Sequence, residues 1–286
     1  MAKLVLLGLV LPVVLCATAL IGAWRPWRPG APIAGGLWAG AVALGIGFVP
    51  AFLAADPWPG LPPHVTWHWI AWLAVVAAAL GAADGLHRWP LQVRLSAALA
   101  LAAGCGWLLV GDWVTHAWAW RGTTALVIAL LLVTLNASAQ RHRGASVPLS
   151  MCLAALGASV VLFLSGNAKL ALLAGALAAC LGVAVVLAWW RPEVSLARGG
   201  VPVVAVLLPG LVLSGYFLSW SEIAPWVFVL AAITPVFIWV SGSIPLDRLP
   251  PWQATTVRVA LVALTVAVTV TAAMEGRTPE DPSSPY

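Results

Sequence analysis

The feature that most constrains this chain is a succession of apolar runs, each close to 20 residues long, joined by short connections rich in proline, glycine and charge. A transmembrane helix needs about 20 mostly apolar residues. The runs predict ten membrane spans, near 4–24, 33–55, 66–84, 93–111, 122–139, 148–166, 169–190, 200–219, 223–242 and 255–274. We therefore expect an all-α, polytopic bundle of about ten transmembrane helices.

Composition excludes a soluble fold. The chain is 62% hydrophobic and 8% charged, whereas soluble domains are about 25% charged. A protein of this size cannot hide that much apolar surface in its own interior, but lipid can solvate it. Residues 1–274 are expected to form a single transmembrane domain, and the polar tail 275–286 to be disordered.

The basic residues alternate between the two sets of connections. One set carries Arg25, Arg28, Arg88, Arg94, Arg141, Arg143, Arg191, Arg198, Arg248 and Arg258, and the other carries Lys3, Arg121, Lys169 and Arg277. Because basic residues near span ends are retained in the cytoplasm, both termini are predicted on the non-cytoplasmic side of a bacterial inner (plasma) membrane. The net charge of +5 is dispersed in this way, so we expect no nucleic-acid partner.

Two segments admit a second interpretation. Lys3 precedes an apolar run that contains Ala17-Thr18-Ala19, a pattern that also fits a cleaved signal peptide. The prolines of 200–242 would remove backbone donors and kink membrane helices, so a broken or re-entrant helix is an alternative there. Five spans followed by five also permit an inverted repeat, although no residue pattern demonstrates one.

Few polar groups lie inside the predicted spans. All nine acids fall at span ends, in connections or in the tail, which argues against a carrier coupled to ions through a buried acid. Milder groups such as Thr134, Asn136, Ser138 and Thr234 are expected to form interhelical hydrogen bonds. The glycines of the second span, Gly36, Gly40, Gly45 and Gly47, predict close helix packing.

Two connections on the predicted outer face combine tryptophan with histidine and aspartate. The candidate cluster consists of Asp56, His64, His68, Trp72, Asp112, Trp113, His116 and Trp120. His64, His68 and Trp72 are four apart and would share one helical face. These residues would form a site only if the two connections meet.

Three interpretations of this cluster stay open. Tryptophan and histidine are common at membrane surfaces, so an interfacial aromatic belt is the simplest. A site for a substrate or lipid head group is the second. The third is a metal, haem or copper site built from His64, His68, His116 and Asp112. No cofactor is identified, since HExxH, Walker and Gly-x-Ser-x-Gly motifs and paired cysteines are absent.

The functional hypothesis is a multi-pass transport protein, an uncoupled carrier of a small apolar or lipid-like solute. Ten spans without a soluble domain are a common carrier layout, and proline-broken helices suit gating. One alternative is a membrane-embedded enzyme that acts on a lipid-linked substrate through the outer His/Asp/Trp residues. Another is a structural, pigment-binding or haem-binding subunit with membrane-protein partners. In each case the lipid bilayer surrounds the protein.

Overall fold

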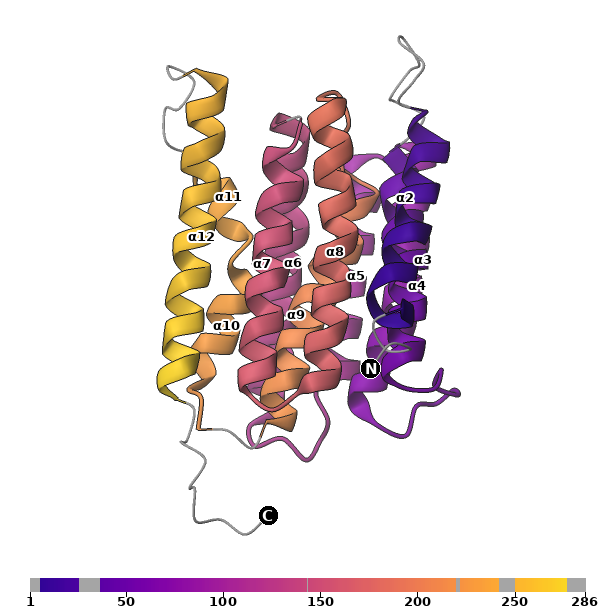
Figure 1. Cartoon of the computed structure of the whole chain (residues 1–286). Coiled ribbons are helices and arrows are strands. Elements are labelled where there is room, and N and C mark those ends of the chain that lie inside the picture. The colour runs from indigo at the N-terminus through magenta and orange to yellow at the C-terminus, as the bar shows by residue number, and fades with distance from the viewer. Residues whose placement is uncertain (1–5, 26–36, 143, 220–221, 242–249, 277–286) are drawn as a thin grey trace.

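The structure is a computed structural model that describes residues 6–25, 37–142, 144–219, 222–241 and 250–276. Within these ranges every regular element is a helix (Figure 1). In chain order the elements are η1 (Leu6–Val10), α2 (Leu11–Trp24), α3 (Leu37–Ala55), η3 (Thr66–His68), α4 (Trp69–His87), α5 (Leu91–Leu109), α6 (Ala117–Arg141), α7 (Ser146–Leu164), α8 (Ala168–Trp190), α9 (Gly200–Leu218), α10 (Pro225–Ile233), α11 (Val236–Ser241) and α12 (Pro251–Glu275).

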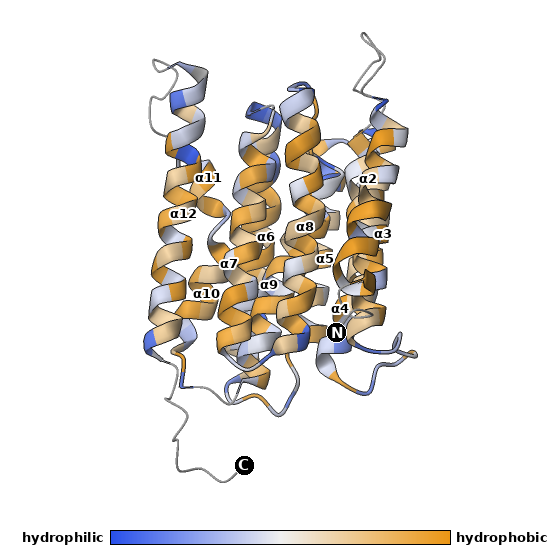
Figure 2. Cartoon of the chain, in the orientation of Figure 1, coloured by the Kyte–Doolittle hydropathy of each residue, from blue (hydrophilic) through white to orange (hydrophobic). Residues whose placement is uncertain are grey.

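The prediction of an all-α, polytopic membrane bundle is confirmed. In the described part of the chain, nine helical segments are long and apolar enough to cross a membrane. They run side by side along one axis, and apolar residues cover most of their length while polar residues gather toward the ends (Figure 2). The chain is therefore a helical membrane protein whose spans contact the lipid bilayer.

The segment predicted as one span at 223–242 is divided into two short helices. α10 ends at Ile233 and α11 begins at Val236, and the two lie one above the other along the bundle (Figure 1). Pro235 lacks an N–H group and its ring disfavours a continuous helix. At this break Thr234 Oγ1 donates a hydrogen bond to the Leu230 carbonyl at 2.8 Å. The broken-helix interpretation of this region is thus the one that the structure shows.

The two ends of the bundle differ in chemistry. The upper end in Figure 1, here called the arginine end, carries Arg25, Arg88, Arg94, Arg141, Arg191 and Arg198. The lower end, here called the tryptophan end, carries the 56–68 and 110–116 connections with Arg121 and Lys169. The other basic residues of the predicted pattern, apart from Arg258 in α12, lie outside the described residues. The alternation of charge along the sequence therefore corresponds to a separation in space.

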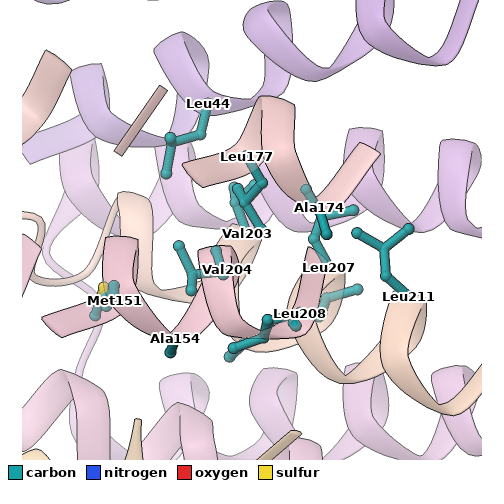
Figure 3. Close-up of a cluster of buried hydrophobic side chains, with 14 of the residues drawn as sticks. Leu44, Met151, Ala154, Ala174, Leu177, Val203, Val204, Leu207, Leu208 and Leu211 are labelled. Atoms are coloured by element: carbon teal, nitrogen blue, oxygen red, sulfur yellow. The ribbon is translucent and has the colours of Figure 1, made fainter. Parts of the chain in front are cut away.

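α9 is the central helix of the bundle. It packs against α3, α4, α5, α6, α7, α8 and α10, and its residues from Val203 to Gly215 are all buried. Figure 3 shows Val203, Val204, Leu207, Leu208 and Leu211 of α9 among side chains of α3, α7 and α8. A helix that is apolar on every side is expected in such a position. Helices from both halves of the chain thus pack around α9.

The predicted packing role of glycine in α3 is confirmed at three positions. A side-chain carbon added to Gly40 would lie 3.2 Å from the backbone nitrogen of Gly200, and one added to Gly45 would lie 2.8 Å from the Ala78 methyl group. At Gly47 it would lie 2.7 Å from the Cys180 sulfur. Gly36 lies outside the described residues. Small residues allow backbones to approach closely, which favours association where lipid provides no hydrophobic driving force.

Candidate functional site

At the tryptophan end, the connection between α3 and α4 forms an ionic contact with the start of α8. Asp56 directly follows α3, and its carboxylate accepts a hydrogen bond from Lys169 Nζ at 2.7 Å. The same carboxylate lies 3.7 Å from His68 Nε2. The hydrogen bond from Lys169 lowers the pKa of Asp56, and burial acts in the opposite direction. Asp56, His68 and Lys169, here called the charge clasp, join the first and second halves of the chain.

Aromatic rings hold the histidine of the charge clasp in place. The rings of His68 and Trp67 are in edge contact, with centroids 4.5 Å apart. Phe52 lies against Trp58, Trp67 and His68, with centroids 5.5–6.1 Å apart. Trp58 in turn packs on the predicted site residue Trp72 at 5.6 Å. Offset and edge-on aromatic pairs of this kind are favourable, so these rings fix the shape of the connection.

The charge clasp borders a shallow depression. It has a volume of about 410 Å³ and is formed by the α3–α4 connection, the α7–α8 turn and the end of α9. The lining residues are Asp56, Val65, Trp67, His68, Gly166, Asn167, Ala168, Lys169, Leu170 and Leu218. Asn167 Nδ2 donates a hydrogen bond to the Gly215 carbonyl at 3.0 Å, which ties the turn to α9. The depression is thus built on hydrogen-bonded elements.

The second predicted connection, between α5 and α6, is organised around Arg121 of α6. The Arg121 guanidinium donates to the Asp112 carboxylate at 2.6 Å and to the Val110 carbonyl at 3.2 Å. It also lies over the ring of Trp107 at 4.3 Å and over that of Trp118 at 5.3 Å. Asp112 is therefore engaged by an arginine and not by a histidine.

The eight predicted site residues do not assemble into one group. Asp56, His68 and Trp72 belong to the first connection, while Asp112 pairs with Arg121. His64, Trp113 and His116 are exposed, and Trp120 packs on Tyr216 of α9 at 4.9 Å. The two connections do meet, at Thr66 and Gly111. In the described part of the chain, no three His, Cys, Asp or Glu residues are grouped so as to hold a metal ion.

Several tryptophans are exposed at both ends of the bundle. From the bounds of the helices that carry or flank them, Trp107, Trp113, Trp118 and Trp226 are exposed toward the tryptophan end, and Trp189, Trp190, Trp239 and Trp252 toward the arginine end. Such rings suit the membrane–water interface, where one edge is apolar and the other wet. The exposed tryptophans therefore match an aromatic belt, whereas Trp58, Trp67 and Trp72 are part of the folded connection.

A cavity that the sequence did not indicate lies at the arginine end. It has a volume of about 210 Å³ and is lined by residues of α4, α5, α6 and α9 and of the segments before α5 and α9. The lining residues are Leu80, Asp84, Trp89, Leu91, Arg94, Leu95, Ala97, Ala98, Leu101, Leu132, Val133, Asn136, Ala137, Gln140, Arg198, Val201 and Pro202. Its charged residues come from the ends of α4 and α5 and from the segment before α9, and Leu80, Leu101 and Leu132 lie deeper in their helices. The charged side chains thus lie at the mouth of the cavity, and its depth is apolar.

A buried acid organises the mouth of this cavity. Asp84, one turn before the end of α4, is 4% exposed. Its Oδ1 accepts a hydrogen bond from the Trp89 backbone N–H at 3.1 Å and lies 3.9 Å from Arg198 Nη1. Buried carboxylates are costly unless paired. The carboxylate therefore holds both the α4–α5 connection and the Arg198 side chain at the mouth.

The segment between α8 and α9 is fixed against α6 by two polar contacts. Asn136 Oδ1 accepts a hydrogen bond from the Arg198 backbone N–H at 3.0 Å, and Ser195 Oγ donates one to the Ala139 carbonyl at 2.8 Å. Arg198 has a left-handed backbone with φ of 64°, a conformation that a non-glycine residue keeps only with such support. These contacts direct the Arg198 side chain into the cavity wall.

The expected interhelical hydrogen bonds formed in only part. Asn136 reaches the segment before α9, as above. Thr134, Ser138 and Thr234 instead donate to carbonyls of their own helix, at 2.7–2.8 Å, so the prediction was wrong for these three. A hydroxyl can always reach the carbonyl one turn earlier in a helix, whereas an amide on a longer side chain reaches across.

Neutralising Asp56 is expected to weaken the folded state in a pH-dependent manner. Because the pKa of Asp56 is lowered on folding, the clasp's contribution to stability is present above the unfolded value of about 3.9 and is lost as the pH falls through the lower folded value. We expect Asp56→Asn to reduce the free energy of unfolding at pH 7 by at most about 1 kcal/mol, since Lys169 is 59% exposed and water screens the pair. Thermal unfolding in detergent at pH 7 and below pH 4 measures the difference.

Lys169→Gln and the double variant complete this comparison. If the pair is the source of the effect, the two single substitutions are not additive at pH 7, and the coupling fades in acid. Strict additivity, or a difference that does not change with pH, would show that the two charges act independently.

No protein-family model matches the chain, and a search of curated proteins finds no match. The case for a function therefore rests on the side chains and cavities described above.

Proposed function

We propose that the protein is a carrier that moves a small apolar or lipid-like solute through the cavity at the arginine end. The observation that carries this proposal is the position of the cavity, where α4, α5 and α6 of the first five spans face α9 of the last five. Carriers built from two halves bind their substrates at such an interface, near the middle of the membrane.

The depth and lining of the cavity suit this role. Leu80, Leu101 and Leu132 line its inner part, and each lies well within its helix, Leu101 near the centre of α5. Arg94 lies seven residues before Leu101 on the same helix, which corresponds to about 10 Å of helical rise. An apolar pocket of this depth accepts a hydrocarbon chain and excludes a strongly hydrated ion.

The opposite end of the same interface is closed by packed side chains. Leu109 of α5 and Ile70 of α4 lie against Gly210 of α9. Nearer the tryptophan end, Trp120 of α6 packs on Tyr216 and Phe217 of α9, with ring centroids 4.9 and 5.4 Å apart. The charge clasp joins the two halves at the same end. A carrier that is open on one side and closed on the other has this arrangement.

The orientation and the lack of coupling are part of the proposal. The arginine end is assigned to the cytoplasm by the positive-inside rule, in a bacterial inner membrane, so the cavity opens inward. Among the described residues no carboxylate lies at the middle of a span, and Asp84 is already engaged by Arg198 and Trp89. We therefore propose passage without ion coupling. The enzyme alternative has less support, because His64 and His116 are exposed and neither forms an ion pair with Asp56 or Asp112 among the described residues.

Accessibility of a cysteine at the cavity floor tests the carrier proposal. The native residues Cys16, Cys105, Cys152 and Cys180 are replaced by alanine, and Leu101→Cys is added as the reporter. In sealed vesicles of either orientation, a membrane-impermeant maleimide is expected to label it from the arginine end only. Removing the clasp with Asp56→Ala and Lys169→Ala should favour opening at the tryptophan end and increase labelling from that side.

Leu99→Cys is the matched control, because Leu99 is 62% exposed on the outer face of the same helix and does not line the cavity. The maleimide labelling of Leu99→Cys should not change when the charge clasp is removed. A reporter at Leu101 that stays unlabelled from both sides would contradict the proposal.

A further inference from the structure

We infer that the solute bound in the cavity is a single-chain amphipath with an anionic head group, a phosphate or carboxylate, held by Arg94 and Arg198. This inference rests on the proposed carrier function and names its substrate class. It follows from the charges at the mouth, the available hydrogen-bond donors there and the apolar lining beneath them.

The mouth carries an excess of positive charge. Asp84, Arg94 and Arg198 are the titratable residues in the cavity lining. Asp84 pairs with Arg198, with 3.9 Å between Oδ1 and Nη1. Arg94 has no ion-pair partner among the described residues. One positive charge at the mouth is therefore uncompensated, and it attracts an anion into a site of low dielectric constant.

Hydrogen-bond donors are also available at the mouth. Arg198 Nη1 is shielded from solvent and has no hydrogen-bond partner in the described part of the chain. Asn136 uses its carbonyl oxygen to accept from the Arg198 backbone, which leaves its amide hydrogens for a ligand. Arginine presents a planar fork of N–H donors that matches the oxygens of phosphate and carboxylate. A buried donor without a partner is costly unless a ligand satisfies it.

The apolar depth selects for a hydrocarbon chain behind the head group. Ala97, Ala98, Leu101, Leu132 and Val133 line the cavity below the arginines. Leu91 and Leu95 of α5 line it and are also exposed, at 58% and 41%, so the site borders the outer surface of the bundle. A free inorganic anion would leave the apolar walls unfilled, whereas an amphipath fills both parts.

Protection of the Leu101→Cys reporter measures this specificity. The protein is reconstituted in phosphatidylcholine nanodiscs and labelled with maleimide in the presence of dodecyl phosphate, dodecanoate, dodecanol, dodecyltrimethylammonium or inorganic phosphate. We expect dodecyl phosphate and dodecanoate to protect the cysteine, and the neutral, cationic and chain-free probes to do so at least about tenfold less well. A tenfold loss corresponds to about 1.4 kcal/mol.

Arginine variants locate the head group. Arg94→Gln and Arg198→Gln should each raise the half-protecting concentration of dodecyl phosphate by about tenfold or more, with partial recovery in Arg94→Lys. Arg141→Gln is the control, because Arg141 lies at the same end but outside this cavity. Equal protection by dodecanol and dodecyl phosphate, or better protection by the cationic probe, would overturn the head-group inference and leave the carrier proposal standing. A reporter that no maleimide reaches would overturn both.

Discussion

Ala98→Trp is expected to block the cavity and, on the proposed carrier function, to stop both entry and passage of solute. Ala98 lines the cavity between Arg94 at the mouth and Leu101 at the floor. An indole placed there fills much of a space of about 210 Å³. Moving it aside requires overpacking neighbours, which typically costs about 1–3 kcal/mol, or about 5-fold to 150-fold in accessibility. Maleimide labelling of Leu101→Cys from the arginine end should therefore fall by at least about fivefold.

Leu99→Trp is the matched control for this prediction. It adds the same ring one position away, on the exposed face of α5, where lipid accommodates an aromatic side chain. Labelling of the reporter should stay at the level of the parent protein, and dodecyl phosphate should still protect it. If Ala98→Trp leaves the labelling rate unchanged, the cavity is not the route to the floor.

Gly81→Leu is expected to prevent accumulation of the folded protein. α4 and α9 meet at this position, where a side-chain carbon would collide with the Gly199 carbonyl oxygen and lie 3.1 Å from the Ala41 methyl group. Backbone atoms of a buried helix start cannot move aside, unlike the end of a flexible side chain. We expect a loss of about 3 kcal/mol or more in the free energy of unfolding, at the upper end of overpacking effects.

Gly182→Leu is the control, because it is expected to leave the free energy of unfolding unchanged or to raise it. No atom lies within 4 Å of the carbon that would be added there. Replacing glycine by leucine within a helix raises helix propensity by somewhat less than about 1 kcal/mol, so this variant should unfold at the same or a higher temperature. Expression yield and thermal unfolding in detergent separate the two variants. Parent-like unfolding of Gly81→Leu would show that α4 and α9 are not in contact.

The architecture was predictable because its signals are long and local. A run of about 20 apolar residues forms a helix in lipid whatever surrounds it, since every backbone group must be satisfied within the segment. The predicted boundary 169–190 therefore lies within one residue of α8, Ala168–Trp190. Pro235 could likewise be expected to interrupt a helix, and it does so between α10 and α11.

The cavity was not predictable, because its members are ordinary when read singly. Asp84 appeared as an acid at a span end, and Arg94 and Arg198 as charges that set topology. Asn136 and Gln140, one turn apart on α6, offered a faint signal of a polar helical face. Only the packing of α4, α5, α6 and α9 brings these side chains from four segments to one place.

The outer histidines show the opposite case, a pattern that was conspicuous in sequence and dispersed in space. His64 and His68 are four apart, but η3 begins only at Thr66, so the two residues do not share a helix. Asp112 had Arg121 within reach, and a carboxylate pairs more strongly with a guanidinium than with a neutral imidazole. The spacing that suggested a metal site therefore depended on a helix that starts two residues later.

The amino-acid sequence by itself determined that this protein is a helical membrane bundle, how many apolar runs it has and where arginine is concentrated. These properties depend on composition and on interactions within single segments. The tertiary structure alone decided which faces of those helices meet, and thus that Asp84, Arg94 and Arg198 border a cavity while His64 and His116 stay at the surface. The physical reason is that helix rotation and contact in lipid are set by close packing at positions such as Gly81 and Gly199. Such packing joins residues far apart in the chain.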